Sequence, residues 1–178
     1  QLGPAEIPPK RDWLNKYCLR YAAINGFHYN PPKKHPFNPL FALRLSSKEV
    51  SGIHQFRVIE TIFESGWTMG KDLGDLSTLI SLLEQKSIKI KNIRKQVSDP
   101  IIKKILFNET SRAIELGVFG VPTIIIDHNL FWGSDQMEHI DLFLSGKDPL
   151  DLKKFKEHIK RPRAIDRKAF GKMNVYKK

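Results

Sequence analysis

The sequence predicts an α/β fold in which helices outnumber strands, and the segment from residue 115 to 135 is the main reason. A helix ends at Gly117, because glycine best adopts the left-handed conformation past a helix end. Pro122 then leads into residues 123–127, an apolar β-branched run too short for a helix. A second short strand at 130–132 and a helix start at 133–134 follow. We therefore expect a β-hairpin between two helices.

The Val121–Pro122 bond is expected to be cis. An X-Pro bond can be cis at a cost of only about 0.5–1 kcal/mol, so a turn that needs a cis bond needs proline there. A cis bond would turn the Val121 backbone outward, where its N–H and C=O could pair with an extended peptide. The alternative is a trans proline that merely starts the strand.

Helices are predicted before this segment from apolar periodicity and capping residues. The first runs over about residues 10–25 and stops at Gly26. Asn38 is expected to cap the next helix, with Pro39 at its first position. A long amphipathic helix should follow. The residues expected on its apolar face are Ile53, Phe56, Ile59, Ile62 and Phe63.

Two aspartates mark the later helix starts. Asp75 is expected to cap a helix that carries Leu76, Leu79, Ile80 and Leu83. Ser98-Asp99-Pro100 should open the helix that ends at Gly117. After the hairpin, a last core helix is expected to end at Gly146. We thus expect one domain over residues 1–146, with a helical insertion over about 36–117, and a C-terminal tail over 147–178.

Two linked motifs resemble a known family. The string Gly-Val-Phe-Gly-Val-Pro-Thr at 117–123 is followed, after one hairpin, by Phe-Trp-Gly-Ser-Asp at 131–135. Both resemble motifs of the 2-hydroxychromene-2-carboxylate isomerases and kappa-class glutathione transferases, members of the DsbA-like thioredoxin superfamily. The proline-rich residues 4–11 and the segment 36–44 look like further parts of that family. The resemblance covers roughly residues 4–146 and implies a thioredoxin-like fold with a helical insertion.

The resemblance also implies a glutathione site. Val121 would pair with the glutathione backbone and Pro122 would fix its geometry. Ser134 and Asp135 would hold the γ-glutamyl end, although ordinary helix capping would also place such residues there. Lys10 matches a basic residue that approaches the bound peptide, although a lysine at a helix start is often only a solvated charge.

The family's chemistry is isomerisation through reversible addition of the glutathione thiolate to a conjugated double bond, or a related transfer. Its substrates are small and derived from aromatic rings. In the family a strand, a catalytic serine and a helix precede the proline-rich loop, and no serine in this sequence matches that one. We therefore expect an N-terminally incomplete fold in which binding survives and catalysis is weak.

Composition excludes several other classes of protein. A chain of 178 residues with 40% hydrophobic residues can bury one substantial core. The apolar runs are far shorter than the roughly 18 residues of a membrane span. A single cysteine, Cys18, rules out an internal disulfide or a Cys-x-x-Cys pair, and it suits a reducing compartment, the mitochondrial matrix or the cytoplasm. The six histidines show no paired metal-ligand spacing.

The positive charge is concentrated in the tail. Residues 147–178 hold 12 Lys and Arg against four Asp and Glu, a net of +8 out of the total of +11. Such an arm could neutralise RNA phosphates, although it could also be a solvated extension. The alternative function is therefore a non-catalytic structural subunit, for example in a mitochondrial ribosome. The candidate RNA-binding residues are Lys160, Arg161, Arg163, Arg167, Lys168 and Lys172.

Overall fold

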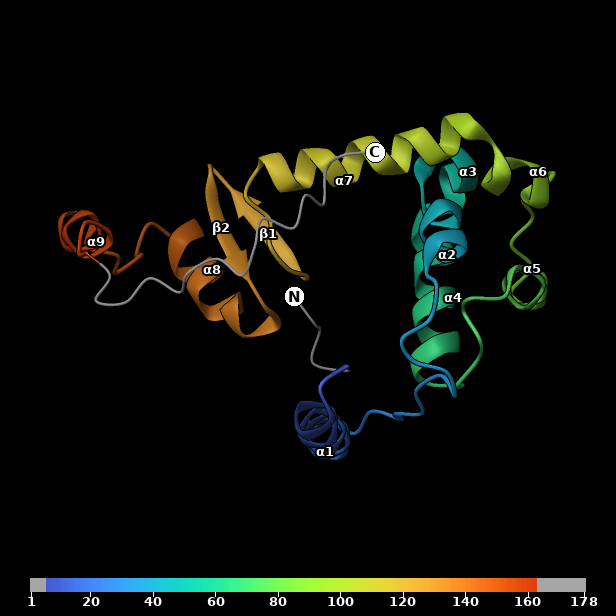
Figure 1. Ribbon diagram of the computed structural model, residues 1–178, viewed down its shortest axis with the longest axis horizontal. Helices are drawn as coiled ribbons and strands as arrows, with labels where there is room; N and C mark the ends of the chain where they lie inside the picture. The colour runs from blue at the N-terminus through green and yellow to red at the C-terminus, as the bar shows by residue number, and fades with distance from the viewer. Residues whose placement is uncertain (1–5, 163–178) are drawn as a thin grey trace, which may run out of the picture. The chain divides into compact units, whose positions relative to one another are not determined.

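The computed structural model describes residues 6–162, which form an N-terminal unit up to Gly117 and a C-terminal unit from Val118 (Figure 1). Each unit is described by itself. The N-terminal unit consists of helices: α1 (Pro8–Asn25), α2 (Leu40–Leu45), α3 (Lys48–Ser51), the 3-10 helix η2 (Gly52–His54), α4 (Gln55–Trp67), α5 (Leu76–Gln85), α6 (Ile93–Ser98) and α7 (Pro100–Glu115). The C-terminal unit contains β1 (Thr123–Ile126), β2 (Asn129–Trp132), η3 (Ser134–Gln136), α8 (Met137–Leu144) and α9 (Leu152–Ile159).

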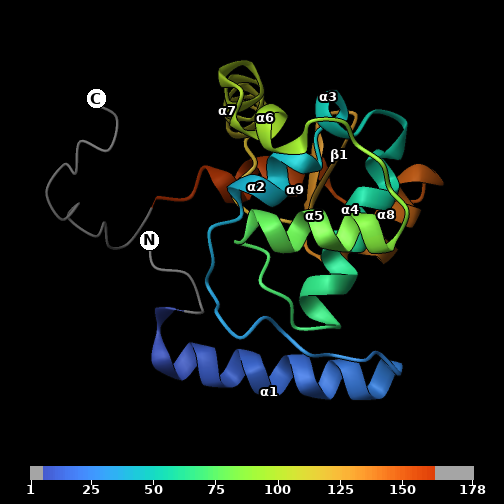
Figure 2. The same ribbon diagram turned by 90° about the vertical axis from the view of Figure 1, so that its right-hand side faces the viewer.

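Helix α1 ends where the sequence predicts. Gly26 has a φ of 68°, and the N–H of Phe27 bonds to the carbonyl of Ala22 at 2.8 Å, which closes the helix. The following segment runs back alongside α1 (Figure 2). It places Tyr29 beside Cys18, which is half-buried. Burial, and then the Cys18 thiol, raise the pKa of Tyr29.

The core of the N-terminal unit lies among helices α2 to α7. Its members are aliphatic side chains from every one of these helices and from the loops beside α5. The most deeply buried are Leu45, Val58, Leu79, Leu83 and Val97. This cluster falls within the predicted helical insertion, which is made of shorter helices than expected.

The predicted apolar face of the long helix is confirmed for Ile62, which is buried, and is wrong for Ile53, Phe56 and Phe63, which are exposed. Gly52 has a φ of 54°, which interrupts the helix between α3 and α4 and changes the direction of the residues that follow. Ile53, which lies in η2, is 96% exposed, whereas Ile62 in α4 is 8% exposed. The residues of α4 that are buried are Val58, Thr61, Ile62, Ser65 and Gly66.

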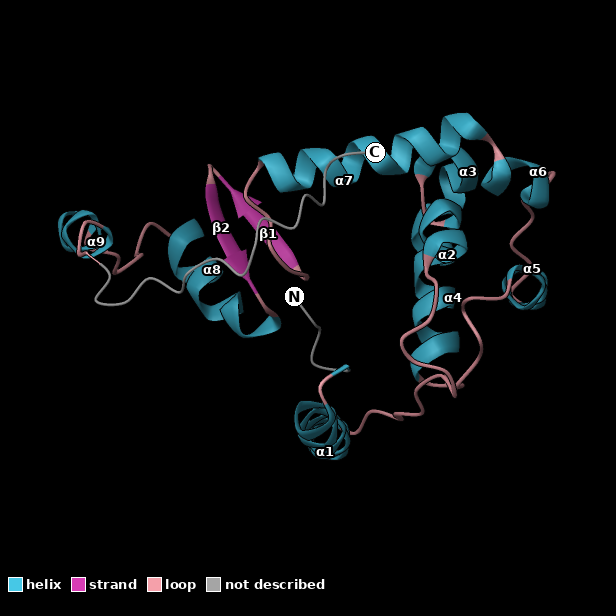
Figure 3. Ribbon diagram, viewed as in Figure 1, coloured by secondary structure: helices cyan, strands magenta, loops and turns pink. Residues whose placement is uncertain are grey.

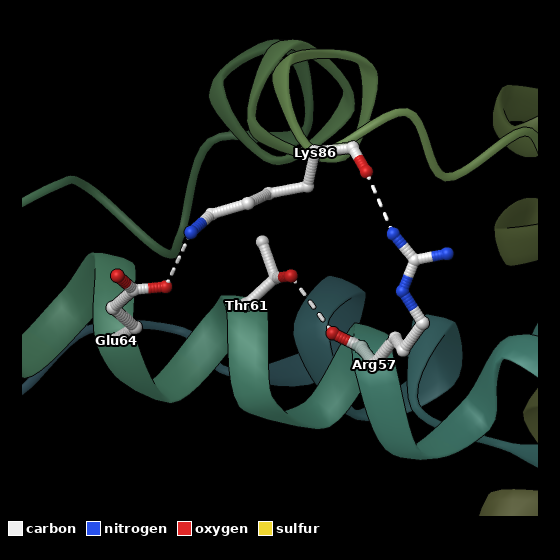
Figure 4. Close-up of polar contacts among 4 residues, drawn as sticks. All are labelled: Arg57, Thr61, Glu64 and Lys86. Carbon is white, nitrogen blue, oxygen red and sulfur yellow. Dashed lines mark hydrogen bonds and ion pairs between the residues drawn. The ribbon is translucent and has the colours of Figure 1, made fainter.

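Polar contacts join α4 to the end of α5 (Figure 4). The Nη2 of Arg57 donates a hydrogen bond to the backbone carbonyl of Lys86 at 2.8 Å. The Nζ of the same lysine lies 2.8 Å from the Oε2 of Glu64. Arg57 thus satisfies a carbonyl at the C-terminal end of α5, where a positive charge is favourable.

The two predicted aspartate caps are present. The Asp75 carboxylate accepts the N–H of Thr78 at 2.7 Å, and the Asp99 carboxylate accepts the N–H of Ile101 at 2.7 Å. Asn38, two residues before α2, accepts the N–H of Leu40 at 3.0 Å, and Pro39 stands in the cap position. These local signals placed three helix starts within about two residues, the usual uncertainty of a helix end.

The C-terminal unit contains the predicted hairpin (Figure 3). β1 and β2 pair antiparallel, with Thr123 opposite Trp132 and Ile126 opposite Asn129. The two residues between the strands, Asp127 and His128, have φ values of 46° and 67°. Positive φ at both positions is the requirement of a two-residue turn whose twist matches the strands.

Helix α8 packs beside the hairpin, and α9 follows it. The rings of Phe131 and Phe143 meet edge to face with their centroids 5.7 Å apart, and Ile140 is buried. α9 was not predicted, and it lies inside the predicted basic tail without a buried residue. The division of the chain at residue 146 stays a prediction. Among the helices in the described part of the chain, none is long and apolar enough to cross a membrane.

Candidate functional site

Val121 and Pro122 form the centre of the candidate site. The predicted cis bond between them is present. Val121 is 86% exposed. Within residues 6–162, neither its N–H nor its C=O has a hydrogen-bond partner. The backbone of this residue therefore offers one donor and one acceptor to a ligand.

Hydrogen bonds on both sides hold this segment. The Thr123 hydroxyl donates to the carbonyl of Gly120 at 2.6 Å. The N–H of Gly133 donates to the carbonyl of Pro122 at 3.0 Å, which extends the pairing of the hairpin by one step. Val121 thus lies between fixed neighbours, so a ligand that pairs with it would order little additional backbone.

An aromatic pair stands next to Val121. The rings of Phe119 and Trp132 lie with their centroids 5.1 Å apart, and both side chains are exposed. The indole of Trp132 occupies the space that a Cβ on Gly120 would need. Glycine is therefore required here because of this close approach. Phe119 was not among the predicted site residues, although the Phe-Gly pair before Val-Pro was the signal that could have indicated it.

Ser134 and Asp135 begin the helical segment after the hairpin, as predicted. Both are exposed and lie in η3, directly before α8. Their side chains make no capping hydrogen bond at this helix start, so the described contacts give no support to ordinary capping. The only described contact of the Asp135 carboxylate is Nε2 of Gln136 at 3.4 Å. Its oxygens are available to a positively charged group.

Lys10 lies in the first turn of α1, in the N-terminal unit, and is exposed. Its ammonium group has no carboxylate partner in the described part of the chain. The approach of Lys10 to a peptide bound at Val121 stays a prediction.

The predicted RNA-binding residues fall in two groups. Lys160 and Arg161 follow the end of α9 and are exposed. Arg163, Arg167, Lys168 and Lys172 lie outside the described residues. Across residues 6–162, no three His, Cys, Asp or Glu side chains gather in a way that could hold a metal ion.

Comparisons with known proteins agree with this architecture. Residues 1–145 match the family model of the DSBA-like thioredoxin domain. A solved structure of selenomethionine 2-hydroxychromene-2-carboxylate isomerase superposes with a TM-score of 0.69, covering 90% of this chain and 76% of that one. Its 17% identity shows a shared fold and nothing finer. No curated protein sequence gave a significant match. The family match spans the N-terminal unit and, in the C-terminal unit, the cis-proline hairpin and all of α8, and the chain therefore belongs to the DsbA-like thioredoxin family.

Proposed function

We propose that this protein is a glutathione-dependent isomerase or transferase of the 2-hydroxychromene-2-carboxylate isomerase and kappa-transferase type. The observation that supports this most is the backbone of Val121, beside the cis Pro122, whose N–H and C=O have no hydrogen-bond partner among residues 6–162. Glutathione is an extended tripeptide, and one N–H and one C=O on an exposed residue suit two hydrogen bonds to its backbone. When bound, glutathione supplies a thiolate as nucleophile.

The charged residues of the proposed site match the ends of glutathione. The Asp135 carboxylate would pair with the α-ammonium of the γ-glutamyl residue, and the Ser134 hydroxyl would orient it. Such charge-assisted hydrogen bonds are about twice as strong as neutral ones. Lys10 is the basic residue that the family resemblance predicts for a carboxylate of the bound peptide.

The second substrate would contact the aromatic pair. Phe119 and Trp132 present exposed rings within one or two residues of Val121 along the chain or across the hairpin. Flat, apolar surface of this kind favours a planar, conjugated molecule by stacking. We therefore propose a small substrate derived from an aromatic ring.

Calorimetry with glutathione tests the proposal, with Asp135→Ala as the variant. Losing a charge-assisted bond should weaken binding by about tenfold or more. Glu138→Ala removes another exposed carboxylate, in the first turn of α8, and should bind like the wild type. Absence of binding, or equal binding by the wild type and Asp135→Ala, would contradict the proposal.

The alternative is a structural subunit that binds RNA through its tail, and it rests on the positive charge of residues 147–178. Four of its six candidate residues lie outside the described part of the chain, so it stays a prediction of the sequence. Deleting residues 163–178 tests it. Loss of salt-sensitive association with RNA in a chain that still folds would favour the structural role.

A further inference from the structure

The last described helix, α9, has an apolar stripe that no described residue buries. Leu152, Phe155 and Ile159 recur at helical spacing and occupy about 60° of arc. They are 60%, 48% and 64% exposed. Three large apolar side chains on one side of a two-turn helix are unusual for a solvated segment, so this stripe indicates a contact surface.

The helix that carries this stripe, and the residues after it, are rich in cations. The cations between residues 151 and 162 are Lys153, Lys154, Lys156, Lys160 and Arg161, against the carboxylates of Asp151 and Glu157. Among the described residues, one of these cations forms an ion pair: Lys154 lies 3.8 Å from Asp151, and both side chains are well exposed. An exposed ion pair of this kind contributes little to the stability of the helix. The helix and its C-terminal flank therefore carry a net positive charge.

The start of α9 is well defined. The Asp151 carboxylate accepts the N–H groups of Lys153 at 2.9 Å and Lys154 at 3.0 Å. Such a cap fixes the first turn, but two turns alone are marginally stable in water. A surface that covered the apolar stripe would stabilise the helix further.

We infer that α9 binds the surface of an anionic lipid bilayer. A helix with a narrow apolar side and a lysine-rich polar side lies in the plane of the membrane interface, with its apolar side chains at the boundary of the acyl chains. Lys156, next to the stripe in the helical projection, could extend its long side chain to lipid phosphates. Anionic lipid attracts such cations. RNA would use the cations but leave the aliphatic side chains in water, so the combination favours a bilayer.

Co-sedimentation of the full chain with vesicles tests the inference. Vesicles of equal parts phosphatidylcholine and phosphatidylglycerol should bind the protein, and vesicles of phosphatidylcholine alone should bind it at least about tenfold more weakly. Changing Lys153, Lys154 and Lys156 to Gln together should remove most of the binding. Changing Leu152, Phe155 and Ile159 to Ser together should do the same. Because α9 has no buried residue, both variants should keep their far-UV spectra apart from α9 itself.

A matched control removes apolar surface elsewhere. Ile53, Phe56 and Phe63 are exposed at 96%, 71% and 62%, and changing all three to Ser should leave vesicle binding unchanged. The inference is overturned if the anionic vesicles do not bind, if the α9 serine variant binds like the wild type, or if the control loses as much binding. Binding of a single-stranded RNA in place of vesicles, dependent on the lysines but not on the stripe, would also overturn it.

Discussion

The hydroxyl of Thr123 donates a hydrogen bond to the carbonyl of Gly120 at 2.6 Å, across the two residues that form the centre of the proposed glutathione site. Together with the bond from Gly133 to Pro122, it holds the backbone on both sides of Val121. The site is thus ordered by neighbours while its own donor and acceptor stay available, which lowers the entropy lost on binding.

Thr123→Val should therefore weaken glutathione binding. The substitution keeps the shape of the side chain and removes a bond worth about 0.5–1.5 kcal/mol that orders the backbone beside Val121 before a ligand binds. Calorimetry should therefore show a loss of affinity of at most about two- to tenfold, the limit reached if the whole bond energy is needed to order this backbone on binding. Thr110→Val is the control, because the Thr110 hydroxyl bonds to the carbonyl of Leu106 within α7. Equal effects of the two variants on affinity would contradict the role of Thr123.

Phe119→Ala should selectively weaken binding of glutathione conjugates that carry an aromatic group. S-benzylglutathione should bind the wild type more tightly than S-methylglutathione, because its ring can stack on the aromatic pair. Removing Phe119 should lower this preference by about three- to tenfold, as expected for one aromatic contact. Phe107, an exposed ring on α7, provides the control variant Phe107→Ala. An unchanged preference in Phe119→Ala would show that the ring does not contact the substituent.

The sequence predicted the hairpin and most helix starts because each depends on one or two local residues. Asp75 and Asp99 cap their helices, and Gly117 has the positive φ expected past a helix end. The face of α4 could not be predicted in this way. Phe56 and Phe63 are exposed in the same uninterrupted helix in which Val58 and Ile62 are buried, and which side of α4 faces the core is a tertiary arrangement.

α9 and the aromatic pair were missed for different reasons. The predicted tail was treated as a basic arm, although Asp151 followed by Leu152 and Phe155 carried a capping and periodicity signal. The exposed contact of Trp132 with Phe119 is a tertiary arrangement that no short pattern encodes. Of the proposed ligand residues, the sequence predicted Ser134 and Asp135 at a helix start, and the structure places them there.

Ile53 and Ile62 were predicted on the same apolar face but differ in burial, and the energetic consequence of this difference can be measured. Ile62→Ala should destabilise the protein by about 2–5 kcal/mol, because it opens a cavity in the core. Ile53→Ala should change the free energy of unfolding by less than about 0.5 kcal/mol, because that side chain is already in water. Urea unfolding measures both. Similar losses of stability in the two variants would contradict the finding that Ile53 is exposed and Ile62 is buried.

The Asp75 cap should make stability depend on pH. The Thr78 hydroxyl, and then the Thr78 N–H, hold the pKa of Asp75 below its ordinary value. Since the folded pKa is the lower one, the stabilisation is present above the ordinary carboxyl pKa of about 3.9 and is lost as the pH falls through the folded value. The wild type should therefore lose its advantage over Asp75→Asn in acid. Urea unfolding over a range of pH measures this, with Glu84→Gln, which changes an exposed carboxylate on the same helix, as the control variant.

Hydrogen exchange at the Val121 amide tests the central claim most directly. The free protein should exchange this N–H rapidly, because it has no acceptor among the described residues and is exposed. With saturating glutathione, a hydrogen bond from Val121 to the ligand should slow exchange at this amide by about tenfold or more, read by residue-resolved NMR. The Asp127 amide, in the hairpin turn, should change little. An unchanged Val121 rate under conditions where calorimetry shows glutathione bound would contradict the proposed site.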